Sequence, residues 1–204
     1  MARKIKTSGR ENQSRTFGIS EPRKKRKPKL PGDLDSDALL SQIIRVDQAG
    51  EYGAKRIYEG QLAVLGGSEV ASTLDHMLQQ ENFHLKSFDD LIVARGVRPT
   101  ALQPLWHVAG FALGAATALL GKEAAMACTV AVEEVICEHY DEQLILLGED
   151  ETDLRAMITE FYNDELEHRN LGLEEGAERA PVYTLLKAGI KAGSRIAIWL
   201  AKRI

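Results

Sequence analysis

Residues 74–92, LDHMLQQENFHLKSFDDLI, carry apolar side chains at a regular spacing of three and four positions. Such spacing is typical of an amphipathic α-helix that buries one face. Glu81 lies on the apolar stripe, and His84 lies one turn further along it. Because residues three apart share a helix face, the sequence predicts that this carboxylate and imidazole point into the core together. The stripe consists of Leu74, Met77, Leu78, Leu85, Phe88 and Ile92.

The same pair of side chains occurs a second time, as Glu165 and His168. A further glutamate precedes each pair, with Glu51 thirty residues ahead of Glu81 and Glu133 thirty-two ahead of Glu165. A single Glu-x-x-His arises readily by chance in a Glu-rich helix, but two copies with matched partners indicate an internal repeat of two helical hairpins. The alignment of Glu51 with Glu133 also pairs Tyr58 with Tyr140, Gln61 with Gln143 and Leu62 with Leu144.

Helical periodicity chooses between the adjacent residues Glu133 and Glu134. The face of Glu133 is largely apolar, whereas Glu134 shares its face with Glu138, Asp141 and Glu142. We therefore predict that Glu133 points inward. The face of Glu51 is the least apolar of the four, so its inward orientation is inferred from the repeat.

Six side chains are therefore candidate metal ligands: Glu51, Glu81, His84, Glu133, Glu165 and His168. Four ionised carboxylates in one core require compensating positive charge, because burying an unpaired charge costs more than the whole stability of a domain. Two divalent cations would balance them. One Glu from each of two helices, with Glu-x-x-His from each of two others, matches the ligand pattern of di-iron helical bundles.

The donor set also suggests which metal and which neighbours to expect. Carboxylates and imidazoles without a thiolate favour iron or manganese over zinc or copper, and we expect iron. Six ligand residues leave coordination positions open for O₂. Asp47 is predicted to accept a hydrogen bond from a ligand imidazole, and Tyr58 and Tyr140 are predicted to contact ligand carboxylates.

Composition and chain breaks favour a single all-α domain over residues 33–204. The chain has 204 residues, of which 44% are hydrophobic, and its net charge of -4 does not indicate a nucleic-acid binder. Glycine and proline breaks predict four long helices, over residues 36–65, 68–95, 122–147 and 152–173. Four such helices make a bundle.

Two further segments and the N-terminus suggest contact with a membrane. Residues 105–120 are apolar, and residues 183–204 are amphipathic with Trp199 near two basic residues. Both are predicted to lie in a membrane interface rather than cross it, with core packing as the alternative. Residues 1–32 are predicted to be a disordered basic tail, either simply solvated or attached to anionic lipid.

Longer blocks of the sequence resemble the demethoxyubiquinone hydroxylase family over residues 40–204. They are Arg45–Ala54 (RVDQAGEYGA), Arg98-Pro-Thr, Leu105-Trp106, Leu119–Glu123 (LLGKE), Met126–Glu134 (MACTVAVEE) and Glu165–His168 (ELEH). The resemblance implies a ferritin-like four-helix bundle with extra helices for membrane contact. It also implies two iron ions per chain on the six ligands named above, O₂ as co-substrate and NADH as the reductant. The implied reaction is ring hydroxylation of 5-demethoxyubiquinol (2-polyprenyl-3-methyl-6-methoxy-1,4-benzoquinol) in ubiquinone biosynthesis.

The resemblance also implies partners and a location. We expect a polyprenyl quinol substrate, peripheral membrane association and a lipid-binding accessory protein of the same pathway, with no nucleic-acid partner; a homo-oligomer stays open. The expected location is the cytoplasmic face of a bacterial inner membrane, with the matrix side of the mitochondrial inner membrane as the alternative.

A second enzyme class uses nearly the same ligands, namely a ferritin- or rubrerythrin-like iron oxidase or peroxidase. Rubrerythrins usually add cysteine-ligated iron, which two isolated cysteines, Cys128 and Cys137, do not provide. A membrane-bound scaffold whose metals only stabilise the bundle is the third reading.

Overall fold

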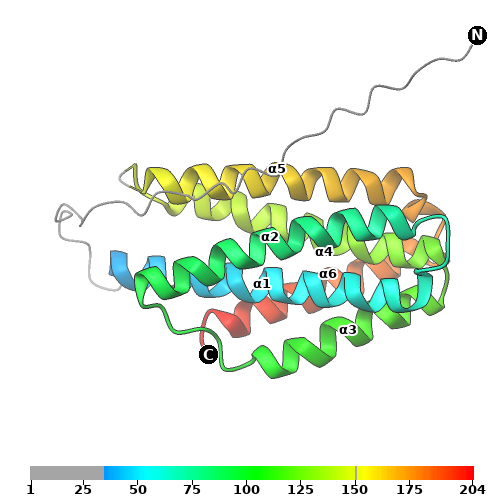
Figure 1. Ribbon diagram of the computed structural model, residues 1–204, viewed down its shortest axis with the longest axis horizontal. Helices are drawn as coiled ribbons and strands as arrows, with labels where there is room; N and C mark the ends of the chain where they lie inside the picture. The colour runs from blue at the N-terminus through cyan, green and yellow to red at the C-terminus, as the bar shows by residue number, and fades with distance from the viewer. Residues whose placement is uncertain (1–34, 150) are drawn as a thin grey trace, which may run out of the picture.

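The structure, a computed structural model, describes residues 35–149 and 151–204, which form helices and their connections (Figure 1). The predicted basic tail, residues 1–32, lies outside the described residues. The described part contains no strand, so the predicted all-α fold is confirmed. The long helices are α1 (Ser36–Leu65), α2 (Ala71–Arg95), α4 (Lys122–Leu146) and α5 (Thr152–Glu174). The other elements are α3 (Gln103–Leu119), a short 3-10 turn η1 (Ala177–Arg179) and α6 (Tyr183–Ala201).

One predicted helix start differs from the structure. The sequence predicts a start at Ser68, whereas α2 begins at Ala71. The Ser68 hydroxyl donates instead to the carbonyl oxygen of Leu65 (2.6 Å) and closes the turn after α1. Serine competes for backbone groups in this way, which favours turns over helix interiors. At its other end, α2 stops at Gly96, whose φ of 62° lies in the left-handed region that suits glycine.

The helices form two similar units of three. In each unit the first two helices pair, α1 with α2 and α4 with α5, and the third packs on the first, α3 on α1 and α6 on α4. Figure 1 shows α3 along the lower edge of the molecule beside α1. The internal repeat predicted for the two hairpins therefore extends to a third helix in each half.

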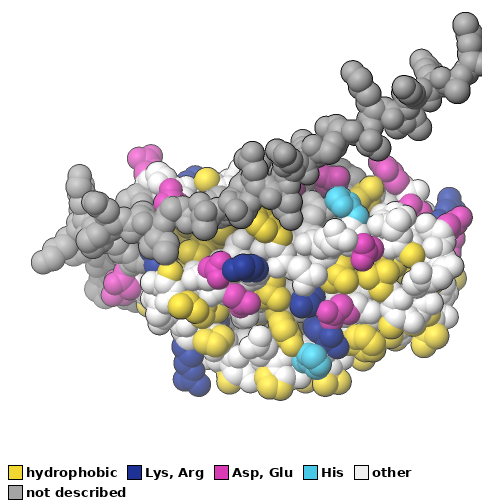
Figure 2. Space-filling view, viewed as in Figure 1, with side chains coloured by type: hydrophobic (Ala, Val, Ile, Leu, Met, Phe, Trp, Pro, Cys, Tyr) yellow, Lys and Arg dark blue, Asp and Glu magenta, His cyan; other side chains and the backbone are white. Residues whose placement is uncertain are grey.

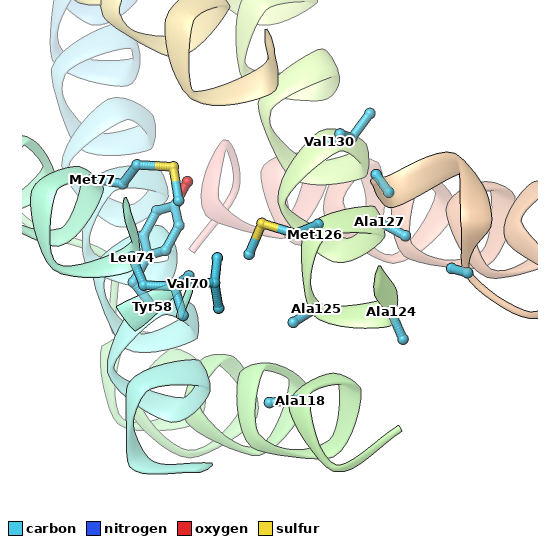
Figure 3. Packing of buried hydrophobic residues seen from close by; sticks show 12 residues of the cluster. Tyr58, Val70, Leu74, Met77, Ala118, Ala124, Ala125, Met126, Ala127 and Val130 are labelled. Carbon is cyan, nitrogen blue, oxygen red and sulfur yellow. The ribbon is translucent and has the colours of Figure 1, made fainter. Parts of the chain in front are cut away.

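The core has two apolar clusters along the bundle. In one, Leu74 and Met77 of α2 face Tyr58 of α1 and Met126 of α4 (Figure 3). The other contains Ile44, Phe88, Tyr140, Ile158 and Phe161, with Phe88 and Phe161 in edge-to-face contact. Along α2, the Glu-x-x-His pair lies between Met77 and Phe88, so the polar ligands occupy the middle of the bundle between the two clusters.

Glycines allow α1 and α3 to touch backbone to backbone. A Cβ atom added at Gly114 would lie 2.0 Å from the carbonyl oxygen of Ile57, and one at Gly60 would lie 2.3 Å from that of Phe111. No larger residue fits at either position without moving a helix. Among the described residues, no helix is long and apolar enough to cross a membrane.

Candidate metal centre

The fold brings all six predicted ligands into one buried cage. Each is at most 1% exposed. Their donor atoms form two overlapping groups, and within each group the atoms lie within 4.8 Å of one another. One group contains Glu51, Glu81, His84 and Glu165, and the other contains Glu81, Glu133, Glu165 and His168. Since Glu81 and Glu165 belong to both, these two carboxylates are placed to bridge a pair of cations.

The predicted orientation of the adjacent glutamates in α4 is confirmed. Glu133 points into the cage and is 1% exposed. Glu134 points toward α6, where it forms ion pairs with Lys187 (2.5 Å) and Lys191 (2.8 Å). Lys191 also reaches Glu138 at 2.9 Å, so this outer face fastens α6 to α4.

Both imidazoles present the same nitrogen to the cage. His84 Nδ1 lies 3.1 Å from Glu165 Oε1 and 3.4 Å from Glu51 Oε2. His168 Nδ1 lies 3.0 Å from Glu165 Oε2 and 3.2 Å from Glu81 Oε1. Each Nδ1 is thus the atom available to a cation, and each Nε2 faces away.

Two tyrosines hold the outer carboxylates from across the bundle. The Tyr58 hydroxyl donates to Glu133 Oε1 at 2.6 Å, and the Tyr140 hydroxyl donates to Glu51. Each tyrosine thus belongs to one hairpin and its glutamate to the other. These contacts restrict Glu51 and Glu133, the two carboxylates that belong to only one of the two donor groups.

The imidazole partners differ from those predicted. Asp47 does not hydrogen-bond to either imidazole; its carboxylate accepts a hydrogen bond from Gln143. Instead, His84 Nε2 contacts Asp164 Oδ2 and His168 Nε2 contacts Gln80 Oε1, each at 3.1 Å. The sequence contains one partial indication of these partners, since each directly precedes the glutamate of a Glu-x-x-His pair. That position does not indicate which imidazole the residue contacts.

The charges in the cage shift the ionisation of its members. Burial, followed by repulsion from neighbouring carboxylates, raises the pKa values of Glu81 and Glu133 well above the usual range. For Glu165, burial also acts to raise the pKa, but hydrogen bonds from His168 and His84 outweigh it and lower the pKa. Without a cation, the cage therefore retains protons on some of its ligands.

The hydrogen bonds within the cage do not satisfy all of its buried oxygen atoms, and bound metal ions would. Buried ligand oxygens without a hydrogen-bond partner are Glu51 Oε2, both side-chain oxygens of Glu81 and Glu133 Oε2. Unpartnered buried polar atoms are costly, so they indicate a missing positive partner. Hard oxygen donors with two imidazole nitrogens suit iron or manganese.

An apolar cavity of about 380 Å³ lies between α1, α3, α4 and α6. Its wall includes Gly50, the neighbour of Glu51 in α1, and Val132, the neighbour of Glu133 in α4. The cavity therefore runs along the two helices that carry Glu51 and Glu133. Other lining residues are Trp106 and Leu113 of α3 and Ile198 of α6.

Comparison with known proteins agrees with this geometry. Residues 38–201 match the family model described as ubiquinone biosynthesis protein COQ7. The chain is 55% identical over 183 residues to 3-demethoxyubiquinol 3-hydroxylase of Rhodospirillum rubrum, covering 89% of this chain and 86% of the relative. It is 54% identical to the human NADPH-dependent 3-demethoxyubiquinone 3-hydroxylase, mitochondrial, with 84% of this chain and 81% of the relative covered. It is 42% identical to the yeast (Saccharomyces cerevisiae) 5-demethoxyubiquinone hydroxylase, mitochondrial, with 87% and 84% covered. The chain belongs to the COQ7 family of ubiquinone biosynthesis proteins.

Proposed function

We propose that the protein is a di-iron monooxygenase that hydroxylates the ring of 5-demethoxyubiquinol with O₂ in ubiquinone biosynthesis. The observation that carries this proposal is the buried cage of four glutamates and two histidines beside an apolar cavity. The relatives are named hydroxylases of demethoxyubiquinol or demethoxyubiquinone, which supports the same reaction.

In this proposal the cage would hold two iron ions, and Glu81 and Glu165, which belong to both donor groups, would serve both of them. Glu51 and His84 complete one position, and Glu133 and His168 complete the other. Bound iron supplies the binding and reduction of O₂. One oxygen atom enters the ring C–H bond and the other leaves as water, which consumes two electrons and two protons.

The protein's own groups orient the reactants. The apolar cavity takes the quinol ring and the first part of its polyprenyl tail, and it excludes water from the reacting carbon. Tyr58 and Tyr140 keep the two terminal carboxylates in place. Holding reactants in a fixed orientation removes part of the entropic barrier before the chemistry begins.

The outer surfaces of α3 and α6 are proposed to meet the membrane in which such a substrate dissolves. Exposed apolar side chains on these helices are Leu105, Val108, Leu119, Leu185, Ile196 and Trp199. In Figure 2 hydrophobic side chains occur along the lower edge of the molecule, where α3 lies in Figure 1. The Arg203 guanidinium lies 3.9 Å from the centre of the Trp199 ring, a combination suited to an interface. We propose peripheral association with the cytoplasmic face of a bacterial inner membrane, the mitochondrial matrix side being the alternative.

The reductant is proposed to be a reduced nicotinamide nucleotide. The family resemblance implies NADH, whereas the human relative is named NADPH-dependent. A lipid-binding accessory protein is proposed to deliver the quinol, and residues 33–204 are proposed to form the catalytic domain. Oxygen uptake that requires added quinol, measured with each nucleotide in turn, identifies the preferred donor.

The apolar cavity favours hydroxylation over the iron oxidase or peroxidase alternative. An iron oxidase needs a polar path for iron, whereas this cavity is walled by aliphatic residues, glycine and tryptophan with a single serine, Ser194. A long apolar substrate explains such a wall, because burial of each methylene group contributes about 0.8 kcal/mol to binding.

The test is the quinone profile of cells that lack this gene and carry either Glu133→Ala or Glu134→Ala. The two changes are adjacent and chemically identical, but only Glu133 belongs to the cage. We expect Glu133→Ala cells to accumulate a quinone that lacks one methoxy group, and Glu134→Ala cells to make ubiquinone. Purified Glu134→Ala protein should also retain two iron ions per chain, unlike Glu133→Ala. If cells that lack both this gene and any redundant hydroxylase still had a normal ubiquinone pool, the proposal would be overturned.

A further inference from the structure

The two halves of the cage are related by the internal repeat, and their outer contacts are reciprocal. Alignment of Glu81 with Glu165 pairs Gln80 with Asp164. Asp164 of α5 contacts the imidazole of α2, and Gln80 of α2 contacts the imidazole of α5. Both contacts join Nε2 to a side-chain oxygen at 3.1 Å. The two contacts therefore have the same geometry but involve different chemical groups, a carboxylate at Asp164 and an amide at Gln80.

The difference is one of charge. Asp164 is a carboxylate with 29% of its side chain exposed, and it faces His84. Gln80 is a neutral amide, and it faces His168. A carboxylate that accepts the outer imidazole N–H makes the inner nitrogen a stronger donor to a metal than an amide does. Its negative charge also lies close to whatever cation His84 binds.

A second pair of equivalent positions differs in the same direction. The offset that aligns Glu51 with Glu133 pairs Asp47 with Thr129. Gln143 donates to Asp47, and its repeat counterpart Gln61 lies 3.4 Å from the Thr129 hydroxyl. The acidic residue again lies on the side of the cage formed by Glu51 and His84: Asp164 contacts His84, and Asp47 lies one turn before Glu51 in α1.

We propose that Asp164 and Gln80 are positioning residues that make the two metal positions unequal. The position formed by Glu51 and His84 takes a divalent cation first, and the position formed by Glu133 and His168 fills second. The bridging carboxylates, shared by both, do not distinguish them. This inference rests on the metal centre proposed above and adds an order of filling to it.

Manganese(II) is a suitable probe, because free Mn²⁺ is measured directly by electron paramagnetic resonance. Metal-free full-length protein is titrated with Mn²⁺ as wild type, Asp164→Asn and Gln80→Glu. Wild type is expected to bind two ions with unequal dissociation constants. Asp164→Asn, which keeps the side-chain shape, should weaken the tighter site by about 10- to 100-fold, as loss of such an imidazole partner typically does.

The reciprocal variant protects the test against a folding artefact. Gln80→Glu should tighten the weaker site, a gain that misfolding does not produce. Each change is also made in protein with one ligand histidine removed. In the His168→Ala protein only the position formed by Glu51 and His84 keeps its histidine, and Asp164→Asn should weaken Mn²⁺ binding there. In the His84→Ala protein only the position formed by Glu133 and His168 keeps its histidine, and Asp164→Asn should have little effect.

The outcomes separate this inference from the proposed function. Two equal wild-type constants, or an Asp164→Asn effect that is the same in both histidine backgrounds, would overturn the unequal positions while leaving the metal centre intact. Wild-type protein that binds no Mn²⁺ or Fe²⁺ would overturn both. Circular dichroism of each metal-free variant confirms that the helices are retained.

Discussion

Replacement of Gly114 by alanine tests the close approach of α1 and α3. The new Cβ would lie 2.0 Å from the carbonyl oxygen of Ile57, and ordinary contact begins near 3.4 Å. The helices must therefore separate locally by about 1.4 Å, because both groups belong to the backbone and neither can rotate away. Overpacking of this kind costs about 1–3 kcal/mol, against a gain of about 1 kcal/mol or less from better helix propensity.

The expected net loss is about 1–2 kcal/mol, which lowers Tm by about 2–8 °C in a domain of this size. Thermal and urea unfolding of wild-type and Gly114→Ala protein measure it. Gly189→Ala is the matched control, since Gly189 lies in α6 and its added Cβ meets no atom within 4 Å. That variant should be as stable as wild type or more stable by up to about 1 kcal/mol.

The same substitution should also affect catalysis. Trp106 and Leu113 of α3 line the apolar cavity, so displacement of α3 changes its shape. We expect KM for the quinol to rise in Gly114→Ala below its Tm. Equal stability of the Gly114→Ala and wild-type proteins would refute the close packing of α1 on α3.

Three further predictions concern the cage, the thiols and the outer ion pairs. Because the raised pKa values of Glu81 and Glu133 let the folded, metal-free protein hold protons that the unfolded chain releases, its stability should fall as pH rises above about 5. Urea unfolding at several pH values measures this change in the free energy of unfolding. A bound cation at 100 times its Kd should add about 2.7 kcal/mol to that free energy. Constant or rising stability of the metal-free protein with pH would contradict the prediction. Burial raises the pKa of Cys128 and Cys137 to about 12, so at pH 8 only about one thiol in 10⁴ is ionised. Iodoacetamide should therefore modify both only after denaturation, and rapid labelling of the native protein would count against their burial. Lys191→Ala removes ion pairs with two glutamates of α4 and should cost about 1 kcal/mol at low salt and less in 1 M NaCl; a loss independent of salt, measured by urea unfolding, would argue against an electrostatic role.

Local regularities of the sequence determined the helices. The spacing of apolar residues in 74–92, together with breaks such as Gly96, predicted the type of each element and most boundaries. Both signals are local, because they depend only on residues within a few positions along the chain. The start of α2 was missed because Ser68 bonds the preceding turn rather than opening a helix. The assignment of Glu133 inward followed from the same periodicity.

The clustering of the six candidate ligands in the core was also predictable. Periodicity alone did not orient Glu51, and the internal repeat supplied that assignment. The hydrogen-bond partners of the two imidazoles were not predictable in the same way. Asp164 contacts a histidine eighty residues away, and Gln80 contacts one eighty-eight residues away. No local pattern encodes which helices face each other or how far each is rotated. The prediction for Asp47 failed for this reason, since its neighbour in α4 is Gln143.

The apolar cavity was likewise decided only by the tertiary structure. The sequence marked residues 105–120 and 183–204 as apolar, but membrane contact and core packing explained either segment. In the fold, α3 and α6 each turn one side to the bundle and enclose the cavity with α1 and α4. Sequence alone thus determined the helices and the six candidate ligand residues, which depend on local periodicity and a repeat. Packing between distant helices decided the cavity and the unequal outer contacts of the two metal positions, because only folding brings those surfaces together.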